Sequence, residues 1–263
     1  MTESRTHAGW RLLLVSPRTG ADNMARDEGL MDRARETGEA VFSVYEWERP
    51  TLSLGVNQAA RDRYDLDAIA ARGLDVVRRP TGGRALLHNR EVTYSVAAPI
   101  DDGESLNAAY RRINRILIAG LGLIGVEATE SATATRTPSP GTVPCFATPA
   151  PGELVSRGAK LVGSAQVRKR GVMLQHGSIL IEDAQPLIEL LLTGPKPAPV
   201  PPAATLARIL GRAPAANEVA TALFEAVREL EDSGATPVEE VETAGHTARH
   251  IDRYSNELWT WRR

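Results

Sequence analysis

Residues 78–99 read RRPTGGRALLHNREVTYSVAAP, and the rest of the chain is best interpreted around this stretch. Two arginines precede a Pro-Thr-Gly-Gly turn, and the residues after it are rich in the apolar and β-branched side chains of strands. A Gly-Gly pair allows positive φ and the close approach of another backbone or a ligand. The stretch therefore predicts a strand, a glycine turn and a second strand.

The glycine turn itself has two interpretations. Arg78, Arg79 and Arg84 lie beside it, and guanidinium groups next to backbone N–H donors suit a phosphate or a carboxylate. The alternative is a tight hairpin turn whose arginines are solvated. His88 follows the turn closely, and a lone histidine is more often structural than catalytic. The pattern of this stretch alone leaves both interpretations open.

Length and composition exclude several classes of protein. A chain of 263 residues with 42% hydrophobic and 24% charged residues has ordinary globular composition. Its formal net charge of −2 argues against nucleic acid as a partner. The chain has no apolar run long enough for a membrane span, and residues 1–9 lack the apolar part of a secretory signal. We therefore expect a cytoplasmic protein with no membrane partner.

The hydrophobic pattern predicts alternating strands and helices, and thus an α/β (α+β) fold. We expect Asn23 to cap a first helix that begins at Met24, and residues 127–143, which have no periodicity, to form a loop. We expect strands over residues 10–16, 41–47, 51–55, 74–77, 161–167 and 179–182, and helices over residues 65–72, 105–123, 186–192 and 218–230.

Cys145 is the only cysteine, which excludes an intrachain disulfide and a multi-cysteine metal site. It is therefore either a packed thiol or a reactive one. It lies in Pro-Cys-Phe, ahead of residues 158–181, which read GAKLVGSAQVRKRGVMLQHGSILI. The Gly-x-Lys-x-x-Gly-Ser-Ala-Gln and Gln-His-Gly-Ser runs of this segment, together with the arginine-rich glycine turn and its histidine, resemble the lipoate/octanoate protein ligase and transferase superfamily, which includes the biotin protein ligases.

The resemblance covers residues 10–189 and implies a biotin/lipoate protein ligase-like fold, with a mixed central sheet flanked by helices. With the composition, it divides the chain into a catalytic core over residues 1–194, a Pro/Ala-rich linker over residues 195–216 and a C-terminal helical segment over residues 217–263. We expect that last segment to pack on the same domain, with Trp259 and Trp261 against the sheet.

The resemblance also implies which residues act. Cys145 lies fifteen residues before Lys160, as in the octanoyltransferases that acylate the glycine-cleavage H protein. The resemblance implies that Cys145 is the nucleophile, that Lys160 stabilises the oxyanion, and that Trp47 lies in the wall of the acyl pocket. His88 and His176 are secondary candidates for moving protons. The substrate-binding residues that it implies are Arg79, Thr81, Gly82, Gly83, Arg84, His88, Gly163, Ser164, Ala165, Gln166, His176 and Gly177.

The activity implied is octanoyl transfer. An octanoyl-acyl carrier protein acylates Cys145, and the group passes to a lysine of a lipoyl domain or the glycine-cleavage H protein, with no cofactor or metal. Arg84 and residues 168–170 either face acidic carrier proteins or are merely solvated. The ligases carry an Asn-Asp pair where residues 145–148 hold no carboxylate, which favours transfer. The alternatives are an ATP-dependent lipoate–protein ligase, an amidotransferase between lipoyl domains, and a non-enzymatic acyl-binding module.

Overall fold

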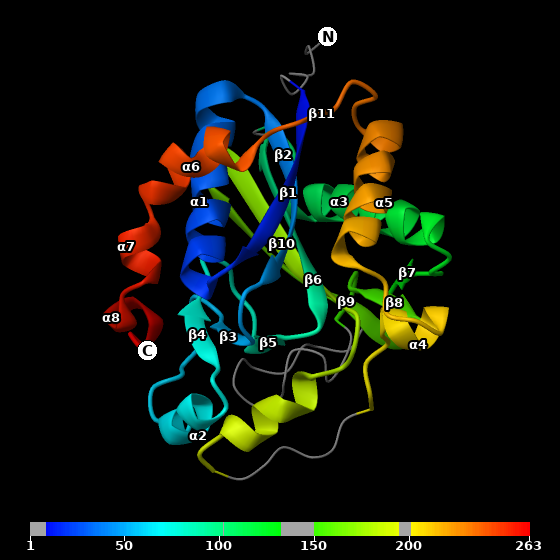
Figure 1. Ribbon diagram of the computed structural model, residues 1–263. Helices are drawn as coiled ribbons and strands as arrows, with labels where there is room; N and C mark the ends of the chain where they lie inside the picture. Colours follow the sequence, from blue (N-terminus) through cyan, green and yellow to red (C-terminus); the bar gives the residue numbers. More distant parts are fainter. Residues whose placement is uncertain (1–8, 102, 133–149, 195–200) are drawn as a thin grey trace.

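The computed structural model describes residues 9–101, 103–132, 150–194 and 201–263. A central eight-stranded sheet dominates this part of the chain, in the order β11-β1-β2-β6-β10-β9-β8-β7 (Figure 1). β1 pairs in parallel with β11 and β2, and the other pairs are antiparallel, so the expected mixed sheet is confirmed. The strands are β1 (Trp10–Arg18), β2 (Ala40–Trp47), β6 (Glu91–Pro99), β7 (Thr129–Glu130), β8 (Leu154–Ser156), β9 (Ala159–Lys169), β10 (Val172–Leu180) and β11 (Thr236–Pro237).

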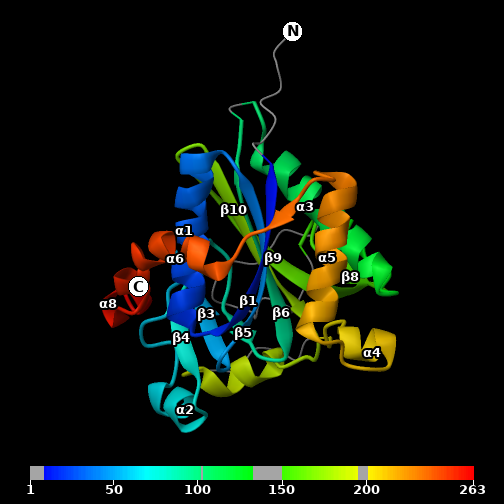
Figure 2. The ribbon, with the colours of Figure 1, turned by 45° about the horizontal axis from the view of Figure 1, so that its top comes forward.

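Helices cover both faces of this sheet, as the resemblance implied (Figures 1 and 2). α1 (Gly20–Thr37) lies on one face, and α3 (Leu106–Leu123) and α5 (Ala216–Leu230) lie on the other. Alternate side chains of β2 point to opposite faces. Phe42 and Val44 join the core under α3 and α5, whereas Val41 and Tyr45 join the core under α1. Both faces of β2 are buried, which explains why residues 40–45 form an almost continuous apolar run.

The strands around the glycine turn do not form a tight hairpin, which was one of its two interpretations. β4 (Asp75–Arg78) and β5 (Leu86–His88) belong to a separate three-stranded sheet in the order β4-β3-β5, with β3 (Thr51–Leu54) in the middle. β3 pairs in parallel with β4 and antiparallel with β5. The glycine turn thus crosses over β3, so β4 and β5 run in opposite directions but are not adjacent strands. α2 (Leu66–Ala71) and a 3-10 helix, η1 (Gln185–Leu191), pack beside this sheet.

The first helix begins earlier than predicted. Thr19 is its N-cap, and the Thr19 hydroxyl accepts a hydrogen bond from the Asp22 backbone N–H at 3.2 Å. Asn23 instead lies inside α1, where its amide donates to the Glu46 carbonyl at 3.3 Å. β1 also continues through Pro17, because the register shifts between Val15 and Arg18 and a strand tolerates proline at such an irregularity.

Other boundaries agree better with the sequence. Ser105 caps α3 and Asp65 caps α2, and both helices lie where the periodicity predicts them. The strand expected only at residues 179–182 instead begins at Val172 and ends at Leu180, so β10 is longer than predicted and includes residues 172–175. The loop expected over residues 127–143 contains β7 at its start, and residues 133–149 lie outside the described ranges.

The C-terminal helices pack along α1 and end at the small sheet. They are α6 (Glu240–Ala248), α7 (Ile251–Tyr254) and α8 (Glu257–Thr260). The Trp259 indole donates to the Arg78 carbonyl at 2.9 Å, and Trp261 packs against the core of the small sheet. The aromatic residues therefore pack on the small sheet and not on the central one.

The division into a core, a linker and a C-terminal segment stays a prediction. Within the range expected as a linker, α4 (Leu206–Leu210) is helical, and Leu206 is buried in the central core. No helix in the described part of the chain is both long and apolar enough to cross a membrane.

Candidate functional site

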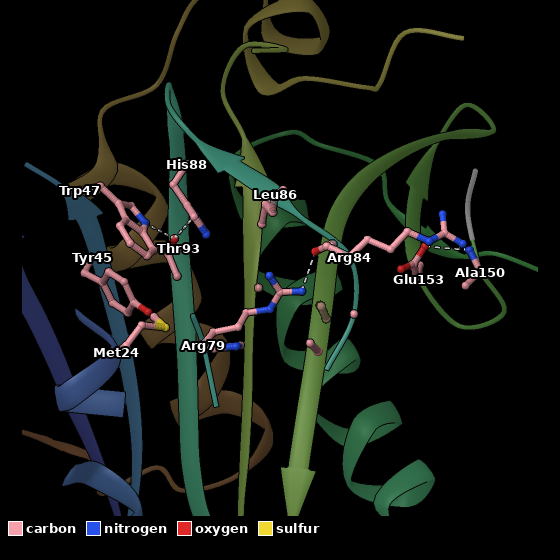
Figure 3. Close-up of a pocket in the computed structure, with 16 residues that line it drawn as sticks. Met24, Tyr45, Trp47, Arg79, Arg84, Leu86, His88, Thr93, Ala150 and Glu153 are labelled. Carbon is pink, nitrogen blue, oxygen red and sulfur yellow. Dashed lines mark hydrogen bonds between the residues drawn. The ribbon is translucent and has the colours of Figure 1, made fainter. Parts of the chain in front are cut away.

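A pocket opens between the central sheet, α1 and the glycine turn (Figure 3). One end is aromatic and apolar, with Met24, Tyr45 and Trp47, and the other end holds Arg84 and Glu153 (Figure 3). The sequence signatures from distant parts of the chain meet here. The expected site residues that line the pocket are Arg79, Gly83, Arg84, His88, Gly163, Ser164, Ala165, His176 and Gly177.

Three other expected residues bond to lining residues from behind the pocket wall. Thr81 bonds to His176, Gly82 bonds to Arg79 through its carbonyl, and Lys160 bonds to Glu153. Gln166 points elsewhere, because its amide donates to the Leu106 carbonyl at the start of α3, at 3.2 Å. Cys145 lies outside the described residues.

Arg78 holds the glycine turn to its surroundings and is fully buried, so the solvated alternative is wrong for it. One of its terminal nitrogens donates to the Gly55 and Gln58 carbonyls at 2.6 and 2.7 Å, and its Nε donates to the Thr260 carbonyl at 2.8 Å. Burial, aided by nearby arginines, lowers the pKa of Arg78 to about 10. It therefore stays charged at neutral pH and is structural.

Arg79 shapes the turn from within. Its guanidinium donates to the Ser53 carbonyl at 2.9 Å and to the Gly82 and Arg84 carbonyls at 2.8 and 2.7 Å. Gly83 has φ +94°, and a Cβ there would lie 2.8 Å from the Arg79 guanidinium. Glycine is thus required at this position both by the backbone conformation and by the space that Arg79 occupies.

His176 joins the turn to α1 through a buried chain of contacts. Its Nε2 lies 2.6 Å from the Thr81 hydroxyl, and its Nδ1 lies 2.6 Å from the Asp27 carboxylate. The Tyr45 hydroxyl donates to the same Asp27 oxygen at 3.0 Å. Burial and the Asp27 carboxylate raise the pKa of Tyr45 well above its usual value, so Tyr45 remains a neutral donor.

His88 forms a second buried network at the aromatic end. Its ring stacks on Trp47 with centroids 3.9 Å apart, its Nδ1 lies 3.1 Å from Glu91, and its Nε2 lies 2.9 Å from the Ser53 hydroxyl. Burial lowers the pKa of His88, which makes the ring neutral at pH 7. The carboxylate then fixes the proton on Nδ1, and Nε2 accepts from Ser53.

Lys160 is the second residue of β9, and its side chain is only 2% exposed. Its ammonium donates to Glu153 Oε1 at 2.7 Å, and Glu153 Oε2 accepts from the Ala150 backbone N–H at 2.7 Å. Glu153 directly precedes β8, which pairs with the start of β9 through an irregular register between Leu154 and Val155. This carboxylate lines the pocket, so the pair is placed at the polar end of the site.

The β9–β10 wall of the pocket is close-packed. A Cβ on Gly177 would lie 2.6 Å from the Gly163 carbonyl oxygen, so only glycine fits there. The Tyr94 hydroxyl lies 2.6 Å from the Ser164 hydroxyl and accepts from Gln175 at 2.9 Å. Burial raises the pKa of Tyr94 to about 12. The wall therefore combines closely packed glycines with neutral hydroxyl groups.

Sequence reasoning missed the partners that orient these side chains. Asp27, Glu91 and Glu153 each hold a site residue, but the sequence around Asp27 gives no signal of a role. The two glutamates could have been suspected from their spacing in the sequence, since Glu91 lies three residues from His88 and Glu153 lies seven from Lys160. Of the basic residues 168–170, Lys169 bonds to Glu28 within the molecule, at 2.6 Å.

A pocket with an aromatic, apolar end and a charged end suits a ligand that has an apolar part and a polar head. The family described as the lipoyl protein ligase A/B catalytic domain matches residues 19–228. The chain belongs to this family.

Named relatives agree with this assignment. The chain is 45% identical to the octanoyltransferase LipM of Kyrpidia tusciae over 193 residues, which are 69% of this chain and 70% of the relative. It is 38% identical to the octanoyltransferase LipM of Symbiobacterium thermophilum over 218 residues, 77% of this chain and 79% of that one.

Solved structures confirm the fold. Lipoate-protein ligase A bound with ATP has a TM-score of 0.77 at 21% identity, with 96% of this chain and 98% of that chain covered. The bipartite lipoate protein ligase of Thermoplasma acidophilum, described with its E2 lipoyl domain, has a TM-score of 0.75 at 21% identity, with 97% of each chain covered.

Proposed function

We propose that the protein is an octanoyltransferase that attaches an octanoyl group to a lysine of a lipoyl domain. The observation that carries the proposal is the 45% identity to an octanoyltransferase over more than two thirds of the chain. The pocket supports it independently, because its aromatic end offers an apolar enclosure and its other end offers charged groups for the reacting carbonyl.

In this proposal the reaction has two steps. The thiolate of Cys145 attacks the thioester carbonyl of octanoyl-acyl carrier protein, and the carrier leaves as the thiol after taking up a proton. A neutral lysine amine of the acceptor then attacks the new thioester, an amide forms, and the Cys145 thiol is released. Each step passes through an oxyanion, and the Lys160 ammonium is the cation that stabilises it.

The lining residues bind the substrate in the same proposal. The octanoyl chain lies along Met24, Trp47 and Leu86, and its carbonyl lies toward Arg84 and Glu153. Gly83, Gly163 and Gly177 place backbone that carries no side chain beside the acyl chain. The neutral His88 closes the aromatic end, whereas Thr81 and His176 keep the glycine turn in place.

The acceptor is proposed as a lipoyl domain. Support comes from the Thermoplasma acidophilum neighbour, which is described together with its E2 lipoyl domain. The glycine-cleavage H protein as acceptor and the acyl carrier protein as donor rest on the position of Cys145 relative to Phe146 and Lys160.

Two substitutions test this chemistry in an ATP-free transfer assay with octanoyl-acyl carrier protein and a lipoyl domain. Cys145→Ser is expected to abolish transfer, and Lys160→Ala is expected to lower kcat by roughly a hundredfold or more. Arg212→Ala is the control, because Arg212 is ion-paired with Glu218 at an exposed site that does not line the pocket. Full activity of Cys145→Ser would refute the covalent route.

A further inference from the structure

The carboxylate of Glu153 has a geometry that its sequence position alone does not reveal. Each of its oxygens has a different partner, with Oε1 on the Lys160 ammonium and Oε2 on the Ala150 backbone N–H, both at 2.7 Å. A carboxylate held at both oxygens has a fixed plane and a fixed position. The long, flexible lysine stem is thereby restricted at its charged end.

Burial strengthens the ion pair between Glu153 and Lys160. The Glu153 side chain is 13% exposed and the Lys160 side chain 2% exposed, so both charges are largely shielded from water. A charge–charge hydrogen bond in such surroundings is stronger than one at the surface. Glu153 lines the pocket, so the ammonium that it holds is one hydrogen bond away from the pocket wall.

The backbone around Glu153 is itself well anchored. The Glu153 carbonyl accepts from the Ser131 N–H at 2.8 Å, and the Gly152 N–H donates to the Ser131 carbonyl at 3.1 Å. The Asn114 side chain of α3 donates to the Gly152 carbonyl at 2.8 Å. These bonds connect the segment to β7 and α3, so the carboxylate is supported by rigid elements and not by a free loop.

We propose that Glu153 is a positioning residue, which holds the Lys160 ammonium at the polar end of the pocket in the geometry needed to stabilise the oxyanion. The inference rests on the proposed function, because it assigns Glu153 a role in that reaction through Lys160. It does not make Glu153 a nucleophile or a proton carrier.

Glu153→Gln and Glu153→Asp separate the effect of the carboxylate charge from the effect of its position. Glutamine keeps the length and can still accept from the Ala150 N–H, but it loses the charge that holds the ammonium. Aspartate keeps the charge and withdraws it by one methylene. Glu182→Gln is the matched control, since Glu182 is paired with Arg90 at an exposed site outside the pocket lining.

The kinetic test measures kcat and KM for octanoyl-acyl carrier protein, together with Tm. Glu153→Gln is expected to lower kcat about tenfold or more while KM changes less than about threefold, and Glu153→Asp is expected to recover part of the loss. Glu182→Gln is expected to match the wild type. A folded Glu153→Gln with wild-type kcat overturns the inference, and if that variant does not fold, wild-type kcat in Glu153→Asp overturns it.

An NMR measurement makes the inference independent of activity. The ammonium ¹H–¹⁵N signal of Lys160, assigned by its loss in Lys160→Arg, is expected in the wild type and is expected to shift or broaden in Glu153→Gln, because the ammonium loses the carboxylate that fixes it. An unchanged signal in Glu153→Gln overturns the inference. A wild-type chain that transfers no octanoyl group refutes the proposed function instead, and the ammonium signal then shows whether Glu153 holds the Lys160 ammonium in place.

Discussion

At the scale of single residues, the site consists of side chains whose partners lie far away in the sequence. His176 was expected at the pocket from its Gln-His-Gly-Ser run, and it lines the pocket, although its role stays a prediction. Its orientation was not predictable, because Asp27 lies 149 residues away and Thr81 lies 95 residues away. Local patterns identify a residue type that suits a site, but pairing across the fold decides how that residue points.

The protonation of His88 leads to a prediction about stability. Burial lowers its pKa in the folded state below the usual 6.5, so the unfolded chain binds the proton more readily. The stabilising effect of a neutral His88 is therefore full above about pH 6.5 and is lost as the pH falls. We expect urea unfolding between pH 8 and pH 5 to show a smaller loss of stability in His88→Gln than in the wild type.

The difference in pH dependence between the wild type and His88→Gln reports on His88, because the other titrating groups are common to both proteins. Several carboxylates with lowered pKa values, such as those of Glu28 and Asp32, also contribute less to the stability of the protein in acid. That loss is the same in the variant. Parallel pH curves for the wild type and His88→Gln would contradict the assignment of a neutral ring.

At the scale of elements, the turn between β4 and β5 shows which features could be predicted from the sequence and which could not. The two strands and the glycine turn were predicted from composition and are present. The hairpin interpretation, one of two left open, is wrong because β3, some thirty residues upstream of β5, pairs between them, and nothing in residues 78–99 signals that insertion. Strand pairing is a tertiary choice, made here by the apolar core of the small sheet.

The two glycines of this turn are expected to differ in their tolerance of a side chain. Gly83→Ala forces a left-handed backbone on alanine and places its Cβ against Arg79, so we expect a loss of about 1–3 kcal/mol in the free energy of unfolding. Nothing lies within 4 Å of a Cβ on Gly82, so Gly82→Ala is the control and should change stability by less than about 0.5 kcal/mol. Chemical denaturation measures both, and equal losses would contradict the described turn.

At the scale of the whole molecule, the mixed sheet with helices on both faces was predictable, since the signatures that carry the resemblance also define the fold. The route of the C-terminal segment was not. It runs down α1 to the small sheet, where the Thr260 carbonyl accepts from Arg78 and the Trp259 indole donates to the Arg78 carbonyl. Arg78 thus connects the signature turn to residues some 180 positions further along the chain.

This connection predicts a large effect of a conservative change. Arg78→Lys removes the planar group that bonds to Gly55, Gln58 and Thr260 at once, and it leaves buried carbonyls unpaired. We expect a loss of roughly 2–4 kcal/mol in the free energy of unfolding, whereas Arg61→Lys, at an exposed position, should lie within about 0.5 kcal/mol of the wild type. If Arg78→Lys is as stable as Arg61→Lys, the guanidinium does not hold the two segments together.

The central claim is that the chain takes up an octanoyl group on Cys145 without ATP and passes it on. Intact-protein mass spectrometry after mixing the protein with octanoyl-acyl carrier protein alone tests this most directly. We expect one hydroxylamine-sensitive octanoyl adduct, located on Cys145 and discharged when a lipoyl domain is added. The absence of an adduct, with acylation of the lipoyl domain only after ATP and free lipoate are supplied, would contradict it and identify a ligase.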